Sequence, residues 1–181
     1  MTTTKNQWIH GSLLTLLLGL GANAAEKSVN IQVDPLSLLN GSVYAYGDFV
    51  AAPGVTVGPT LNLFSAEVLG TKVSVLGAGV RATYSISGTS FQDGWFVAGH
   101  GRYGRATVTE GDQKGKGNVF SFSTLFGYGW YYESGLNFNL GAGAIYFASP
   151  ETVKAEDGSK LEVSSFRGFL PSIDFTMGWA F

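Results

Sequence analysis

Few residues of this chain are suited to acid–base or nucleophilic chemistry. Beyond residue 24 there is one histidine, His100, and the whole sequence has no cysteine. A serine hydrolase needs a histidine base within hydrogen-bond reach of the serine, and an acid that orients the ring. No serine or acid is spaced from His100 as such a triad requires. We therefore predict that His100 is a packed histidine inside the fold, and we predict no catalytic residue.

A metal site would have to use oxygen ligands, because the chain has no thiolate and only two histidines. The densest acidic group comprises Glu151, Glu156, Asp157 and Glu162. Its spacing does not match an EF-hand loop, so a solvated acidic loop is the simpler interpretation. The segments Gly77-Ala78-Gly79 and Gly99-His100-Gly101 do not match the GxGxxG pattern of phosphate-binding loops. We predict no metal and no cofactor.

The elements that position these side chains are β-strands, and the pattern is clearest at the end of the chain. From residue 169 to residue 181, large apolar residues alternate with small or polar ones, which is typical of a strand and not of a helix. One face carries Phe169, Pro171, Ile173, Phe175, Met177, Trp179 and Phe181, and the other carries Leu170, Ser172, Asp174, Thr176, Gly178 and Ala180. The first face suits lipid, and the second suits a lumen.

The same alternation predicts seven earlier strands. They cover residues 29–38, 42–50, 55–64, 73–86, 95–108, 118–130 and 136–147. Glycine, serine, threonine and asparagine gather on one face, as the narrow interior of a small barrel requires. Asn40-Gly41 is predicted to form a two-residue hairpin turn after the first strand.

The composition agrees with a barrel that crosses a membrane. Charged residues make up 13% of the chain and the mean hydropathy is +0.15, whereas soluble domains carry about 25% charged residues. A closed barrel satisfies its backbone polar groups between strands and crosses lipid with alternating hydrophobicity. We therefore predict an all-β fold, an eight-stranded antiparallel up-and-down transmembrane β-barrel. The net charge is −2 and no basic cluster exists, which argues against a nucleic-acid binder.

Residues 1–24 have the features of a cleaved signal peptide. Lys5 supplies a positive start, Leu13 to Leu20 form a short apolar core, and Ala22-Asn23-Ala24 fits the cleavage pattern. We expect residues 25–181 to form a single barrel domain in a bacterial outer membrane.

Loop lengths give the expected orientation, because external loops of such barrels are longer than periplasmic turns. We expect the external loops at residues 65–71, 110–117 and 149–166, and a very short external turn at Asn40-Gly41. We expect the periplasmic turns at residues 51–54, 88–94 and 131–135.

Two segments resemble small outer-membrane β-barrel families of the DUF3575-like and OmpA/OmpX-like kind. They are Val33-Asp34-Pro35-Leu36-Ser37-Leu38-Leu39-Asn40-Gly41-Ser42 and the ending from Pro171 to Phe181. In those families a terminal phenylalanine, preceded by alternating apolar residues, is the signal read by the barrel-assembly machinery. The resemblance implies this assembly role for Ile173, Phe175, Met177, Trp179 and Phe181. It implies no specific activity.

Charged residues on the predicted inner faces are the remaining candidates for function. They are Asp34, Asp48, Arg81, Arg102 and Asp174. An isolated buried charge is costly, so we expect these charges to pair. We predict a structural charge network that fills the lumen, in which Asp34, Arg81, Arg102 and Asp174 take part. A narrow gated pore is the alternative.

The leading hypothesis is a structural or interaction barrel whose surface loops are the contact sites. The expected partners are outer-membrane lipids, lipopolysaccharide and, during biogenesis, the barrel-assembly machinery, with no nucleic acid and a monomeric state. A lipid A-modifying enzyme and a narrow pore are the alternatives within the membrane. A soluble periplasmic barrel is the alternative outside it.

Overall fold

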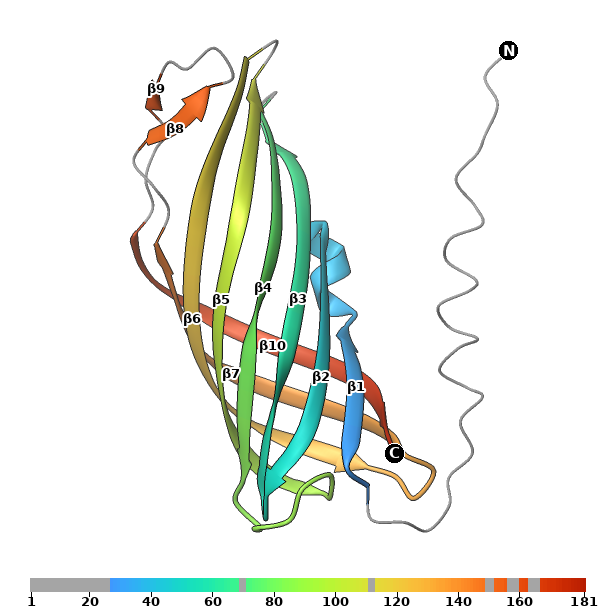
Figure 1. Cartoon of the computed structure of the whole chain (residues 1–181). Helices are drawn as coiled ribbons and strands as arrows, with labels where there is room; N and C mark the ends of the chain where they lie inside the picture. Colours follow the sequence, from blue (N-terminus) through green and yellow to red (C-terminus); the bar gives the residue numbers. More distant parts are fainter. Residues whose placement is uncertain (1–26, 69–70, 111–112, 149–151, 156–159, 163–166) are drawn as a thin grey trace, which may run out of the picture.

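The computed structural model describes residues 27–68, 71–110, 113–148, 152–155, 160–162 and 167–181, and they form a closed β-barrel (Figure 1). Its wall consists of β1 (Val29–Asp34), β2 (Ser42–Ala52), β3 (Val55–Val68), β4 (Thr71–Ser85), β5 (Gly94–Glu110), β6 (Gln113–Tyr131), β7 (Leu136–Ala148) and β10 (Arg167–Ala180). Neighbouring strands pair antiparallel, and β1 pairs with β10 to close the cylinder. The predicted eight-stranded up-and-down fold is confirmed, and its crossing of a membrane stays a prediction.

Side chains alternate between the two faces of the wall, as a strand requires. In β10, Asp174 and Thr176 are buried inside the barrel, whereas Ile173 is 71% exposed outside it. In β4, Arg81 is buried and Leu76 is 64% exposed. The barrel is therefore polar inside and apolar outside, the reverse of a soluble domain.

A small apolar cluster lies among the polar residues of the interior. Phe96, Ala98 and Leu125 pack together on the inner face of β5 and β6. Gly127 leaves the room that Phe96 occupies, because a Cβ at this glycine would lie 2.6 Å from the end of the ring. Small inward residues therefore make space for larger neighbours in a narrow lumen.

The first strand is shorter than predicted. β1 ends at Asp34 and is followed by a 3-10 helix, η1 (Leu36–Asn40), so the strand does not reach residue 38. The Asp34 carboxylate accepts a hydrogen bond from the Ser37 N–H at 3.1 Å, and Ser37 Oγ donates to the Asp34 carbonyl at 2.7 Å. These local bonds, and the missing N–H of Pro35, end the ladder. The predicted Asn40-Gly41 hairpin turn is wrong, because Gly41 instead ends the helix with φ of 77°.

Two of the predicted external loops are also wrong, because they are mostly strand. β3 and β4 remain paired as far as Val68 and Thr71, and β5 and β6 remain paired as far as Glu110 and Gln113. The polar residues of these segments indicated loops. Polar residues are equally compatible with strands where the strands extend beyond the apolar outer face of the barrel.

The third predicted external loop, residues 149–166, contains a small hairpin. It consists of β8 (Thr152–Ala155) and β9 (Lys160–Glu162), and β8 pairs with the first part of β6. In Figure 1 the strands β3 to β6 rise beyond β1 and β2, with this hairpin beside the end of β6. We call this region the extended sheet.

The opposite end of the barrel has short connections, at residues 53–54, 86–93 and 132–135. They lie close to the turns predicted at 51–54, 88–94 and 131–135. The differences are Ala51 and Ala52, which belong to β2, Gly94, which begins β5, and Tyr131, which ends β6.

Candidate functional site

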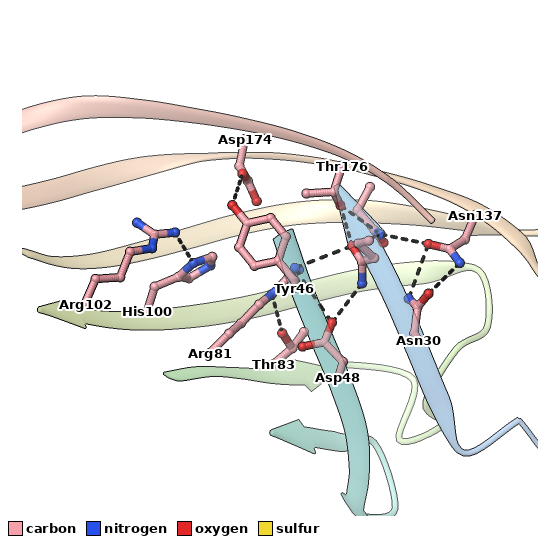
Figure 2. Close-up of polar contacts among 12 residues, drawn as sticks. Asn30, Tyr46, Asp48, Arg81, Thr83, His100, Arg102, Asn137, Asp174 and Thr176 are labelled. Carbon is pink, nitrogen blue, oxygen red and sulfur yellow. Dashed lines mark hydrogen bonds and ion pairs between the residues drawn. The ribbon is translucent and has the colours of Figure 1, made fainter. Parts of the chain in front are cut away.

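Polar side chains from five strands meet at Gln32, in the half of the lumen nearer the short turns. Figure 2 shows its neighbours Asp48, Arg81 and Thr176. Gln32 is 1% exposed. Its amide oxygen accepts hydrogen bonds from Arg81 Nη1 at 3.4 Å, from Asn139 Nδ2 at 3.0 Å and from Thr176 Oγ1. Its amide nitrogen donates to Asp48 Oδ2 at 2.8 Å. Gln32 therefore connects β1 to four other strands of the wall.

Arg81 and Asp48 form a buried ion pair beside Gln32. Arg81 Nη1 lies 3.7 Å from Asp48 Oδ2. The Arg81 guanidinium also lies over the Tyr46 ring, 5.0 Å from its centroid, and its Nε donates to Thr83 Oγ1 at 3.2 Å. A buried charge is tolerated when it is paired and hydrogen-bonded. Arg81 and Asp48 Oδ2 meet both conditions, whereas Asp48 Oδ1 has no hydrogen-bond partner among the described residues.

Asn30 and Asn137 form a reciprocal amide pair at the end of the lumen nearest the short turns. Asn137 Nδ2 donates to Asn30 Oδ1 at 2.9 Å, and Asn30 Nδ2 donates to Asn137 Oδ1 at 3.3 Å. Both residues are fully buried. The pair joins β1 and β7 across the inner face of β10, which lies between them.

His100 and Arg102 lie farther along β5, toward the extended sheet. Arg102 Nη2 lies 2.6 Å from His100 Nδ1. A guanidinium only donates hydrogen bonds, so Nδ1 accepts and the ring proton of His100 is on Nε2. No serine or acid of the described residues hydrogen-bonds to this ring. His100 is thus a packed acceptor for Arg102 and has no triad partner among the described residues.

The lumen holds the four charged residues predicted to form a network, Asp34, Arg81, Arg102 and Asp174, but they contact different partners. Arg81 pairs with Asp48. Asp174 Oδ1 accepts a hydrogen bond from Tyr46 Oη at 3.3 Å, and Asp34 accepts from the Ser37 backbone. No carboxylate of the described residues forms an ion pair with Arg102.

Uncharged amides make most of the contacts that we expected from the charges. Gln32, Asn30, Asn137 and Asn139 were not identified as site residues from the sequence. All four occupy inward positions in the alternation of β1 and β7, and this is the sequence signal that could have identified them. Amides suit these positions because a hydrogen-bonded amide costs less to bury than an ion.

The turn at residues 86–93 covers the lumen at the end with the short connections. Phe91 is buried, and its ring centroid lies 6.1 Å from that of Tyr131. Asp93 Oδ1 accepts a hydrogen bond from the Tyr131 N–H at 2.6 Å and holds the turn in place. The space left between Phe91, Arg81 and Asp48 is about 10 Å³. This volume holds at most one water molecule.

The other half of the lumen is hollow and much less polar. A cavity of about 320 Å³ lies there, and its wall includes Tyr44, Phe64, Val75, Arg102, Val119 and Phe147. The lumen therefore holds a polar hydrogen-bonded network near the short turns and a cavity toward the extended sheet. We call the hollow part the upper chamber.

The residues that resemble an assembly signal lie on the outer face of β10 and at the end of the chain. Ile173, Phe175, Met177 and Trp179 alternate with buried residues. Phe181 follows β10, donates its N–H to the Val29 carbonyl at 2.8 Å, and accepts at its own carbonyl from the Ser28 N–H at 2.5 Å. The last residue therefore takes part in the seam between β1 and β10. Its role in assembly stays a prediction.

Within the described ranges, no group of three or more histidine, aspartate or glutamate side chains is placed to hold a metal ion. Glu162 ends β9, and Glu151, Glu156 and Asp157 lie outside the described residues. The predicted signal peptide, residues 1–24, lies outside them as well. None of the helical segments in the described part of the chain has the length and apolar character needed to span a membrane.

No family model, no curated protein and no solved structure matches this chain, so its function has to be argued from its own residues.

Proposed function

We propose that this chain is an outer-membrane β-barrel of structural or interaction type, held in lipid by its outer face and closed to transport by its own side chains. The observation that carries the proposal is the inversion of polarity across the wall. The ion pair of Arg81 and Asp48 is buried inside. Large apolar side chains are exposed around the outside, among them Leu61, Leu76, Val80, Phe126, Leu140 and Ile173.

Lipid explains this inversion in physical terms. Burying a large aliphatic or aromatic side chain is worth roughly 1.5–3 kcal/mol, so a belt of exposed ones is costly in water. In a bilayer the same side chains face hydrocarbon, and hydrogen bonds between paired strands satisfy backbone groups there.

Aromatic side chains near the short turns support a membrane interface at that end of the barrel, and short turns are typical of the periplasmic side. The Trp95 ring stacks on Phe126 with centroids 5.0 Å apart and meets Tyr128 edge-on at 5.3 Å. Tyr128 in turn contacts Trp130 at 5.0 Å. Tryptophan and tyrosine concentrate at membrane interfaces. The short turns would then lie on the periplasmic side, and the extended sheet outside the cell.

The filled half of the lumen favours a structural role over a pore. Gln32, its four partners and the Phe91 turn occupy this half, and the space enclosed between Phe91, Arg81 and Asp48 is only about 10 Å³. The contact surface of the barrel would then be the extended sheet with its β8–β9 hairpin. Its partners would be lipids, lipopolysaccharide or proteins of the cell surface, with the barrel itself monomeric. His100, occupied by Arg102, offers no support for a lipid-modifying hydrolase.

Fractionation of a Gram-negative host that expresses the full chain tests location. We expect the protein in the outer-membrane fraction, with faster gel migration before heating than after it. Recovery in the soluble periplasmic fraction would contradict the proposal.

Cysteine labelling tests orientation, since the chain has no native cysteine. Lys72 is exposed on the extended sheet, and Thr89 is exposed on the 86–93 turn. In intact cells a membrane-impermeant maleimide should label Lys72→Cys and leave Thr89→Cys unlabelled until the outer membrane is permeabilised. The opposite result would overturn the orientation.

A further inference from the structure

We propose that the upper chamber binds one small amphiphile that has an apolar body and a single anionic group, and that Arg102 is the residue that binds the anion. The inference goes beyond the proposed function, because the site lies inside the barrel whether or not the barrel is in a membrane.

The walls of the upper chamber select for an apolar body. Tyr44, Phe64, Val75, Val119 and Phe147 line it from five different strands. Besides Arg102, its polar lining residues are Ser42, Asn62 and Ser121. The volume of about 320 Å³ falls within the range of small-molecule sites, which are mostly apolar with a few placed polar groups.

The charge in the upper chamber selects for an anion. The Arg102 guanidinium lies over the Tyr44 ring, 5.1 Å from its centroid, and one of its nitrogens is held by His100 Nδ1. These contacts fix the plane of the guanidinium but use one of its five N–H donors, and its buried Nε has no partner. An arginine fixed in this way offers the paired donors that bind a carboxylate in bidentate geometry.

The other charges that face the lumen limit the anion to one negative charge. Arg81 is neutralised by Asp48. Asp34 and Asp174 also point inward, from β1 and β10, and neither lines the upper chamber. Their negative field would oppose a dianion more strongly than a monoanion.

Calorimetric titration of the barrel in lipid nanodiscs tests the proposal, with the heat of empty nanodiscs subtracted. The probes are octanoate, 1-octanol and octylammonium. We expect saturable 1:1 binding of octanoate, with affinity at least about tenfold higher than for either other probe, because charge-assisted hydrogen bonds are about twice as strong as neutral ones. Absence of saturable octanoate binding, or octylammonium binding as tight as that of octanoate, would overturn the proposal.

Two variants and a matched control locate the site. Arg102→Gln should reduce octanoate affinity at least about tenfold and remove the preference over 1-octanol. Arg105→Gln changes an arginine of the same strand that is exposed on the outer face, and it should bind like the wild type. Ser121→Phe keeps Arg102 but fills the upper chamber, and it should lose octanoate and 1-octanol binding alike.

Unchanged octanoate binding in Arg102→Gln or in Ser121→Phe would contradict the proposal. A heat-dependent gel shift verifies that each variant is folded. If the chain proves soluble, the same titration in buffer tests the upper chamber. The proposal of a membrane location and the proposal of an amphiphile site can therefore fail independently of each other.

Discussion

Arg81 of β4 and Asp48 of β2 lie 3.7 Å apart in the lumen, with 2% and 3% of their side chains exposed. Gln32 contacts both, through one hydrogen bond from Arg81 and one to Asp48. β3 separates the two strands in the wall, so the pair bridges them across the interior. The pair and Gln32 therefore act as one polar unit that fixes the barrel from inside.

Removal of one partner of this pair should be strongly destabilising. Asp48→Ala leaves the Arg81 charge buried and uncompensated, and we expect it to reduce the free energy of unfolding by about 3–5 kcal/mol. The double variant Arg81→Met/Asp48→Ala has no unpaired charge and should lose less stability than Asp48→Ala alone. Denaturant unfolding in lipid vesicles, followed by tryptophan fluorescence, measures both. A loss below about 1 kcal/mol for Asp48→Ala would show that the pair is solvated.

Val80→Lys tests whether the outer face meets lipid. Val80 is exposed near the middle of β4, on the opposite face from Arg81. A lysine at the midplane of a bilayer costs about 2–4 kcal/mol in a transmembrane barrel. The same change on the surface of a soluble barrel would fall within about 0.5 kcal/mol.

Thr89→Lys is the matched control for Val80→Lys, because Thr89 is exposed on the 86–93 turn, outside the proposed membrane span. It should be close to neutral in the same vesicle unfolding experiment. Equal and small effects of the two lysines would argue for a soluble barrel.

The sequence was sufficient to predict the eight strands of the barrel wall and their inward faces, but not where β1 ends or how far β3 to β6 extend. The period-two alternation of residues 169–181 persists along β10 and correctly predicts the inward position of Asp174. The same alternation in β4 and β5 correctly predicts the inward positions of Arg81 and His100. This signal is local, and each strand carries it independently of its neighbours. The barrel follows from eight such strands, because a membrane-spanning sheet must close on itself.

The partners inside the lumen were not predictable in the same way. Asn30 and Asn137 lie 107 positions apart, and their contact depends on the registers of β1, β10 and β7 together. The same holds for Gln32 and its partners. The extended sheet was missed for a different reason, because its polar residues lack the apolar alternation that marks a strand in lipid.

At Phe91, replacement by glycine should destabilise the protein no more than replacement by alanine, which reverses the usual order. Among the described residues it is the one non-glycine residue with positive φ, at 57°. This conformation costs an L-residue about 1–2 kcal/mol, whereas the added flexibility of glycine costs roughly 0.5–1 kcal/mol. Phe91→Gly should therefore be no more destabilising than Phe91→Ala. Phe96 is a buried control in strand conformation, where glycine should be the worse replacement. The same order at both sites would contradict the strain at Phe91.

If the polar network near the short turns plugs the lumen, as we propose, the barrel does not conduct. The free space between Phe91, Arg81 and Asp48 is about 10 Å³, too small for a hydrated ion. In planar bilayers we expect no large steady channels from the wild-type protein. Such channels, at an open probability that does not depend on protein preparation, would favour the pore alternative.

Phe181 allows the side chain and the backbone of the last residue to be tested separately. Its backbone N–H and carbonyl bond to Val29 and Ser28 across the seam of β1 and β10, and these bonds do not depend on the ring. Deletion of Phe181 removes both the seam bonds and the ring, whereas Phe181→Ala removes the ring alone. If the ring is part of an assembly signal, Phe181→Ala should slow the appearance of the heat-modifiable form in cells almost as much as the deletion does. In refolding from urea into lipid vesicles, where no assembly machinery is present, Phe181→Ala should fold at close to the wild-type rate. Normal assembly of Phe181→Ala in cells, together with failure of the deletion variant in both settings, would assign the role of the last residue to its backbone bonds.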